Sequence, residues 1–352
     1  MTQPVLARRF INTPTVEALY NAENPESVVD APDDKIEDLS DEYDQVSGTE
    51  SLYYQYIFSH IPRKQDLDSV QGTEGFMSWV KDMVSSLITA VKNFFKWVFS
   101  FFTGKKEVAA RKNKNLIEKL DKNGVKQHFT HYPAGYVSVW ASKAKIPANL
   151  DWMKKAGEDW KKANAKTVEY INEIKKTVNT AESVYLKKGQ LSKGKDELEK
   201  LFKDHHDAIV RIFGKDPALF IGGTYVSITA HGKLSLKPDP DLLESDKNAG
   251  FISSETTTRT LAGDLTTMNT TFQSTIEKST ELEKVFIKGL NSSLEFANVV
   301  EVNNEAVAKQ LTNSLNEIVR NSMAGVKLLE TLLFKVYNSH TAIVESSVET
   351  KG

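Results

Sequence analysis

The chain has 352 residues, a net charge of −2 and no cysteine, which excludes disulfides, thiol catalysis and cysteine-ligated metal sites. The composition is 40% hydrophobic and 26% charged. These values are typical of a folded protein, and the length is sufficient for two domains.

The charge is unevenly distributed along the chain. Residues 1–75 carry a net charge of −10, residues 76–215 carry +13 and the remainder carries −5. We assign residues 1–74 to an acidic, partly disordered arm, because residues 23–50 are acidic, punctuated by proline and poor in apolar periodicity. The arm is either a permanent solvated tail or a removable pro-segment that masks the basic region. Its first residues contain no continuous apolar segment, so we expect synthesis and folding in the cytoplasm rather than secretion.

Residues 75–125 form the second predicted region, an aromatic amphipathic helix followed by a basic one. In residues 76–103 polar side chains recur every three or four positions, which places them on one stripe of a helix. The basic helix, residues 105–122, is predicted to end near Asn123 and Gly124. The apolar face of the aromatic helix consists of Phe76, Trp79, Val80, Met83, Leu87, Val91, Phe94, Phe95, Trp97, Val98, Phe101 and Phe102.

Two interpretations of the aromatic helix are open. A lone transmembrane span is disfavoured, because the longest internal run without a charge is nine residues and a span needs about 20. Contact with an anionic membrane surface or an apolar partner is favoured by the six Phe and Trp residues among residues 94–103. The alternative is a core helix covered by the other helices. The lysines placed to meet lipid headgroups are Lys81, Lys92, Lys96, Lys105 and Lys106.

Residues 126–250 are predicted to form a basic α+β region. It contains a long helix pair, residues 150–186 and 196–213, and a short strand at residues 136–140. A hairpin is expected from residues 224–230 and 233–237 around a His231–Gly232 turn. The lysine face of the first helix is either a solvated surface or a nonspecific contact to the DNA backbone. It consists of Lys154, Lys155, Lys161, Lys162, Lys175 and Lys176.

Residues 251–352 are predicted to be a helical C-terminal region, with apolar residues repeating at helical spacing. Helices of this length and amphipathicity must pack on each other or on partner chains. The predicted fold class is therefore mainly α, with long amphipathic helices and a small β-hairpin or short sheet in the middle region.

No catalytic, cofactor-binding or metal-binding constellation is predicted. Residues 189–196 follow the spacing of a phosphate-binding loop, but Asp196 stands where Ser or Thr would ligate magnesium. The run Asp204-His205-His206-Asp207 cannot surround one ion, because adjacent residues of a helix point about 100° apart. We therefore expect a non-enzymatic protein with no cofactor and no small-molecule substrate.

The tripeptide Gly-Thr-Glu occurs twice, ending at Glu50 and at Glu74, each time just before an aromatic-rich segment. Cleavage after Glu74 would leave a chain with a net charge of +8. The acidic leader ending in Glu, the basic helical body and the lack of cysteine resemble the internal head proteins of large tailed bacteriophages. In those families a protease removes a leader after a small-x-Glu sequence, and the mature protein is packed with the genome and can be ejected with it.

The resemblance implies a virion structural protein of the phage head interior, made in the host cytoplasm, with Glu50 and Glu74 as candidate cleavage sites. Its partners would be other virion proteins or further copies of itself. An anionic membrane and nonspecific DNA contact are further candidate partners. Two alternatives to this function are open: a helical pore-forming toxin or effector, and a structural scaffold or adaptor protein.

Overall fold

The computed structural model describes residues 73–133, 149–182, 194–214, 217–222, 224–229, 232–238, 250–299 and 305–349. All of them belong to one compact unit, which comprises residues 57–352. The prediction of a mainly α fold with a small β region is confirmed, since the described residues form five helices and five short antiparallel strands. The acidic arm and the predicted strand at residues 136–140 lie outside the described residues.

Helix α3, Thr73–Asn123, joins the predicted aromatic and basic helices into one element of 51 residues. The helix runs without interruption through Gly104. A glycine inside a helix costs about 1 kcal/mol relative to alanine, and packing of both halves on α6 outweighs this cost. The helix ends where Gly124 adopts a φ of 77° and its amide donates to the Leu120 carbonyl at 2.9 Å.

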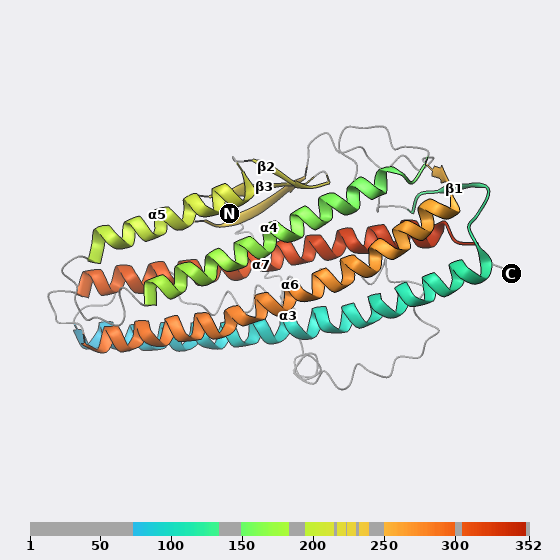
Figure 1. Ribbon diagram of the computed structural model, residues 1–352. Helices are drawn as coiled ribbons and strands as arrows, with labels where there is room; N and C mark the ends of the chain where they lie inside the picture. Colours follow the sequence, from blue (N-terminus) through green and yellow to red (C-terminus); the bar gives the residue numbers. More distant parts are fainter. Residues whose placement is uncertain are drawn as a thin grey trace, which may run out of the picture. The chain divides into compact units, whose positions relative to one another are not determined.

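Four further helices follow in the order that the apolar periodicity predicts. They are α4 (Trp152–Ala181), α5 (Gly194–Phe213), α6 (Glu255–Val299) and α7 (Glu305–Ser346). Helix α6 packs against α3, α4 and α7, and α7 also contacts α3, α4 and α5 (Figure 1). Helices α6 and α7 are antiparallel, since Ser293 meets Thr312 at one end and Thr258 meets Ser347 at the other.

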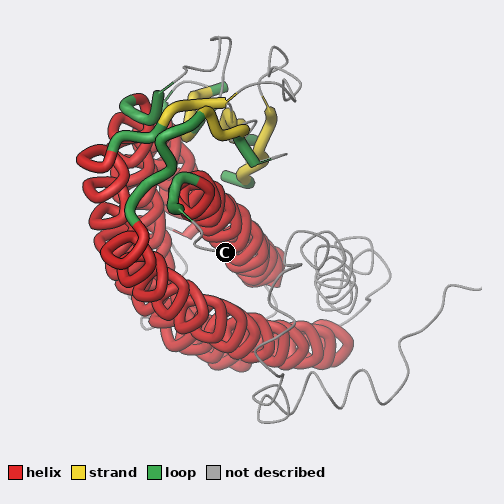
Figure 2. The backbone as a smooth tube through the Cα atoms, turned by 90° about the vertical axis from the view of Figure 1, so that its right-hand side faces the viewer, coloured by secondary structure: helices red, strands yellow, loops and turns green. Residues whose placement is uncertain are grey.

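The strands form two small antiparallel sheets. Strand β1 (Phe129–His131) pairs with β5 (Gly250–Ile252). The second sheet has the order β2-β3-β4, with β2 at Ala218–Ile221, β3 at Thr224–Ile228 and β4 at Leu234–Pro238. The register of β3 and β4, from Thr224↔Pro238 to Ile228↔Leu234, confirms the predicted hairpin. The strands lie beside the helices (Figure 2), where β2 contacts α4 and α5 and β4 contacts α7.

The centre of the core is an aromatic cluster at which α3, α4, α6 and α7 meet. Phe272 of α6 lies 5.4 Å from Phe102, 5.9 Å from Phe334 and 6.4 Å from Trp160, measured between ring centroids. The Trp160 indole donates to the Leu333 carbonyl at 2.8 Å, which satisfies its polar edge inside the core. Side chains from four helices therefore define a single packed interior.

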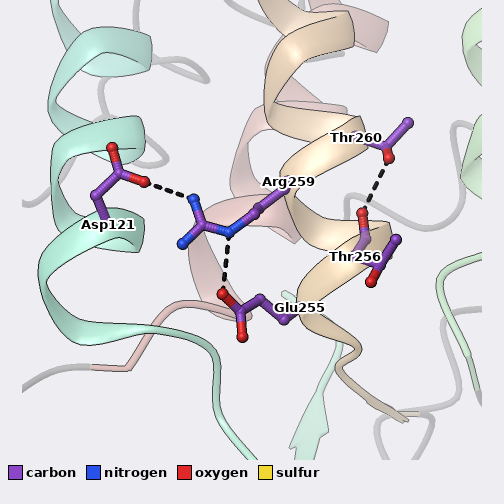
Figure 3. Close-up of polar contacts among 5 residues, drawn as sticks. All are labelled: Asp121, Glu255, Thr256, Arg259 and Thr260. Carbon is purple, nitrogen blue, oxygen red and sulfur yellow. Dashed lines mark hydrogen bonds and ion pairs between the residues drawn. The ribbon is translucent and has the colours of Figure 1, made fainter.

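Polar contacts join the C-terminal end of α3 to the first turns of α6. Arg259 pairs with Asp121 of α3 and with Glu255 of its own helix, and Thr260 donates to the Thr256 carbonyl (Figure 3). The Arg259 guanidinium and its partners are exposed. Exposed ion pairs contribute little to stability, so the Arg259–Asp121 pair marks where the two helices meet without adding much to the stability of the fold, and the other two contacts lie within α6.

Candidate interaction site: the aromatic segment of helix α3

The apolar face of the aromatic segment, residues 76–102, lies mostly in the core of the same chain. Phe95 packs against Phe286 of α6, and the Asn316 amide of α7 donates to the Met83 sulfur at 3.3 Å. The side chains of Trp79, Trp97 and Phe101 are half-buried, and that of Phe76 lies outside the described part. The fully buried members are Val80, Met83, Leu87, Val91, Phe94, Phe95, Val98 and Phe102.

The dense aromatic run at residues 94–103 is accommodated by packing rather than by exposure. Neighbouring rings along α3 pack edge to face or stacked, with centroids 4.9 Å apart for Phe94–Phe95, 5.1 Å for Trp97–Phe101 and 4.9 Å for Phe101–Phe102. Large rings fill a wide interface, because α3 contacts two helices along this stretch. The aromatic density that favoured membrane contact in the sequence therefore has a structural explanation inside the protein.

The polar stripe of the aromatic segment faces solvent. Lys81, Lys92 and Lys96 are exposed, and the side chains of Lys105 and Lys106 lie outside the described part. At the edge of the stripe the Lys327 ammonium of α7 lies 5.1 Å from the centroid of the Trp97 ring, a cation–π contact that ties α7 to α3. Headgroup contact by the exposed lysines stays a prediction.

Among the described side chains of this segment, Phe99 is the most exposed aromatic residue, with 54% of its surface exposed. Its neighbours Lys96 and Ser100 are also exposed. A single exposed phenylalanine is too small for a membrane-binding surface. Contact of the buried members of this face with a membrane or an apolar partner therefore requires α3 to separate from α6 and α7.

The lysine face of α4 is largely paired with carboxylates. Lys161 lies 3.7 Å from Asp264, Lys162 lies 3.3 Å from Asp159, and Lys175 pairs with Glu281. Lys154 and Lys176 have partners at 3.5 Å and 3.4 Å, in Asp151 and Glu173, while Lys155 is exposed. Because these carboxylates neutralise much of the face, it attracts phosphates less than the sequence indicates. DNA contact stays a prediction.

The candidate cleavage sites lie at and before the start of the described bundle. Glu74 is the second residue of α3, and Glu50 lies outside the described residues. Cleavage after Glu74 would remove only the first two residues of α3 and none of the other described elements.

Sequence reasoning missed a buried carboxyl group, Glu330 of α7, which has no exposed surface. Neither carboxyl oxygen has a hydrogen-bond partner among the described residues, and nearby Ser279 donates its proton to the Ile276 carbonyl at 2.9 Å. Burial raises the pKa of Glu330 to about 8, with a smaller opposing effect of Ser279. The sequence could have indicated this burial. Residues seven apart share one face of a helix, and Glu330 lies seven residues from both Met323 and Tyr337, which are buried.

The side chains of residues 204–207 point in different directions, as expected on a helix. His205 is buried and His206 is half-buried, whereas Asp204 and Asp207 are exposed. Among the described side chains no group of three or more potential ligands surrounds a common metal position. The described helices also include none that is long and apolar enough to cross a membrane.

The fold and this segment define a class: a mainly α protein of long, closely packed helices with a small antiparallel sheet, in which an aromatic amphipathic helix is covered by its own chain. Comparison with protein-family models, with curated proteins and with solved structures gave no match.

Proposed function

We propose that this chain is a non-enzymatic structural protein of a phage head interior. The observation that carries the proposal is the position of Glu74, at which the acidic leader would end and the helical bundle begins. Removal of residues 1–74 would change the net charge from −2 to +8 without deleting any helix or strand that the structure describes. A basic, compact body is suited to packing beside a nucleic acid, through charge neutralisation that is independent of base sequence.

We further propose that α3 is a stored amphipathic helix, which engages a membrane or an apolar partner surface after the bundle opens. Leader removal alone does not expose this helix, because α6 and α7 cover its apolar face. Each fully buried Val, Leu, Phe or Met side chain contributes about 1.5–3 kcal/mol. Opening therefore needs a surface that offers α3 comparable apolar burial, as the interface of a lipid bilayer does.

Proteolytic removal of the leader is tested by measuring the intact mass and the N-terminal sequence of the protein from its natural particle. A chain that begins at Ser51 or Gly75 supports processing at the Gly-Thr-Glu sites. A chain that retains residues 1–74 refutes this part of the proposal and makes the acidic arm a permanent tail.

The stored helix is tested by flotation with vesicles that contain phosphatidylglycerol. The probes are the full chain, a chain that starts at Gly75 and a peptide of residues 75–106. We expect the peptide to bind and the Gly75 chain to bind more than the full chain. If neither the peptide nor the Gly75 chain binds, the membrane part is wrong. Lysis of vesicles by the unprocessed full chain would instead favour the pore-forming alternative.

The burial of Phe94, Phe95 and Phe102 favours a second candidate function, a scaffold in which α3 is permanent core. The two functions differ in whether α3 must leave the bundle. Because the chain has no cysteine, Met83→Cys with Asn316→Cys allows an oxidant to form a disulfide that links α3 to α7 where their side chains already touch. Crosslinking abolishes vesicle binding of the Gly75 chain if the helix is stored, and leaves assembly intact if the protein is a scaffold.

A further inference from the structure

His205 of α5 lies at a junction of three elements. Its side chain is only 6% exposed, and its Nδ1 atom lies 2.8 Å from the Thr177 hydroxyl of α4. The other edge of the ring faces Gly232, in the turn between β3 and β4. The backbone approaches closely there, since a Cβ atom placed on this glycine would lie only 3.6 Å from the ring Cδ2 atom. The imidazole is therefore enclosed by α4, by α5 and by the hairpin.

Two basic side chains on α5 and α4 act against protonation of this ring. His206 of the same helix and Lys176 of α4 both disfavour a second positive charge here. The carboxylates of this turn of α5, Asp204 and Asp207, have exposed side chains. Burial, then His206 and then Lys176 lower the pKa of His205 to about 4.

Among the described residues around the ring, few carboxylates offset these basic groups. On α4, Glu173 lies one turn before Thr177, but its carboxylate pairs with the Lys176 ammonium at 3.4 Å. The charged residues in the described part of the hairpin, Lys233 and Lys237, are both cations. Helix α7 runs antiparallel to α4, since Trp160 meets Leu333 and Tyr170 meets Gly325. The part of α7 that lies opposite Thr177 carries one charge of each sign, Glu317 and Arg320. A protonated ring would therefore be buried among like charges.

Helix α5 and the sheet β2-β3-β4 form a cover over apolar surface, which we call the α5–sheet layer. Phe213 of α5 packs on Tyr170 of α4 and on Phe220 of β2, with ring centroids 5.7 Å and 5.8 Å apart. Ile209, one turn after His205, is fully buried, and Leu234 of β4 is 1% exposed. Detachment of this layer would uncover the α4 and α7 surfaces beneath it.

We propose that the α5–sheet layer is an acid-sensitive cover, which His205 holds on α4 while its ring is neutral and releases when the ring is protonated. This inference is independent of the proposed virion function, because it concerns a different face of the bundle. Histidine suits such a device, since its ordinary pKa near 6.5 places its titration just below neutral pH.

The sign and size of the effect follow from linkage. A detached ring binds a proton below about pH 6.5, whereas the docked ring binds it only near pH 4. Between these values each unit of acidification weakens docking about tenfold, so that docking at pH 5 is roughly 20-fold weaker than at pH 7.

The test is hydrogen–deuterium exchange of the full chain at pH 7 and pH 5, corrected for the pH dependence of intrinsic amide exchange. We expect protection of α5 and of β3–β4 to fall about 20-fold at pH 5, while α3 and α6 keep theirs. His205→Asn removes this pH dependence, whereas the exposed His128→Gln retains it. Equal protection at the two pH values, or the same loss in His205→Asn, overturns the proposal.

Thr177→Val provides a second test that leaves the imidazole in place, in case His205→Asn does not fold. This variant weakens docking at both pH values, because it deletes the partner of Nδ1, but it keeps the tenfold change per pH unit. Loss of the pH dependence in Thr177→Val would refute the role of the His205 charge.

Discussion

Phe102→Ala tests whether the aromatic segment of α3 is part of the core. The Phe102 ring is 1% exposed and lies 5.4 Å from Phe272 and 6.1 Å from Phe334. Its neighbours come from α6 and α7, and close-packed interiors relax only partly around a deleted ring. Truncation of a buried phenylalanine to alanine costs about 3–5 kcal/mol, including the cavity that is left. We expect Phe102→Ala to lower the free energy of unfolding by about this amount.

Phe99→Ala is the matched control, since it makes the same chemical change three residues earlier in the same helix. The Phe99 side chain is 54% exposed, so its truncation changes stability by no more than about 0.5 kcal/mol. Urea unfolding followed by tryptophan fluorescence measures both variants, with Trp97 and Trp160 as reporters close to the cavity. Equal effects of the two substitutions, or a Phe102→Ala variant as stable as the unmutated chain, would refute the placement of this face in the core.

Two further predictions concern α7 and its neighbours. With the Glu330 pKa at about 8 when folded and near its ordinary value when unfolded, the folded state retains a proton that the unfolded chain loses. The retained proton therefore stabilises the folded state most below about pH 4.5. Above that pH the folding equilibrium constant falls about tenfold per pH unit, up to about pH 8. Glu330→Gln should remove this slope and be more stable at pH 7; an unchanged difference from the unmutated chain across urea titrations at pH 5, 6 and 7 argues against the buried acid. Gly325→Ala should destabilise the protein by about 1–3 kcal/mol, because the new Cβ atom collides with the buried Tyr170 ring. Gly263→Ala, with open space around its Cβ position, should stabilise it by about 0.5–1 kcal/mol, and thermal unfolding that ranks these two variants in the opposite order contradicts the packing of α4 on α7.

The secondary structure of the described region was largely predictable from local patterns. The predicted helix pair located α4 and α5 to within a few residues, and alternation around a His-Gly turn located the hairpin. Apolar spacing identified residues 251–352 as helical but did not divide them into α6 and α7. The continuity of α3 was not predictable, because the glycine at 104 and the change from aromatic to basic composition both favour a break. Packing of both halves on one partner helix overrides that local preference.

The environment of individual side chains depended on the tertiary arrangement. Periodicity identifies the apolar face of residues 76–102, but apolar burial is nondirectional, and the same pattern fits a bilayer, a partner protein or the chain's own helices. Only the packed bundle placed that face on α6 and α7 and enclosed His205 between three elements. The same arrangement buried the Glu330 carboxyl group in the core and set carboxylates beside the α4 lysines. These features depend on residues that lie far apart in sequence, and local patterns carry no information about which distant residues meet.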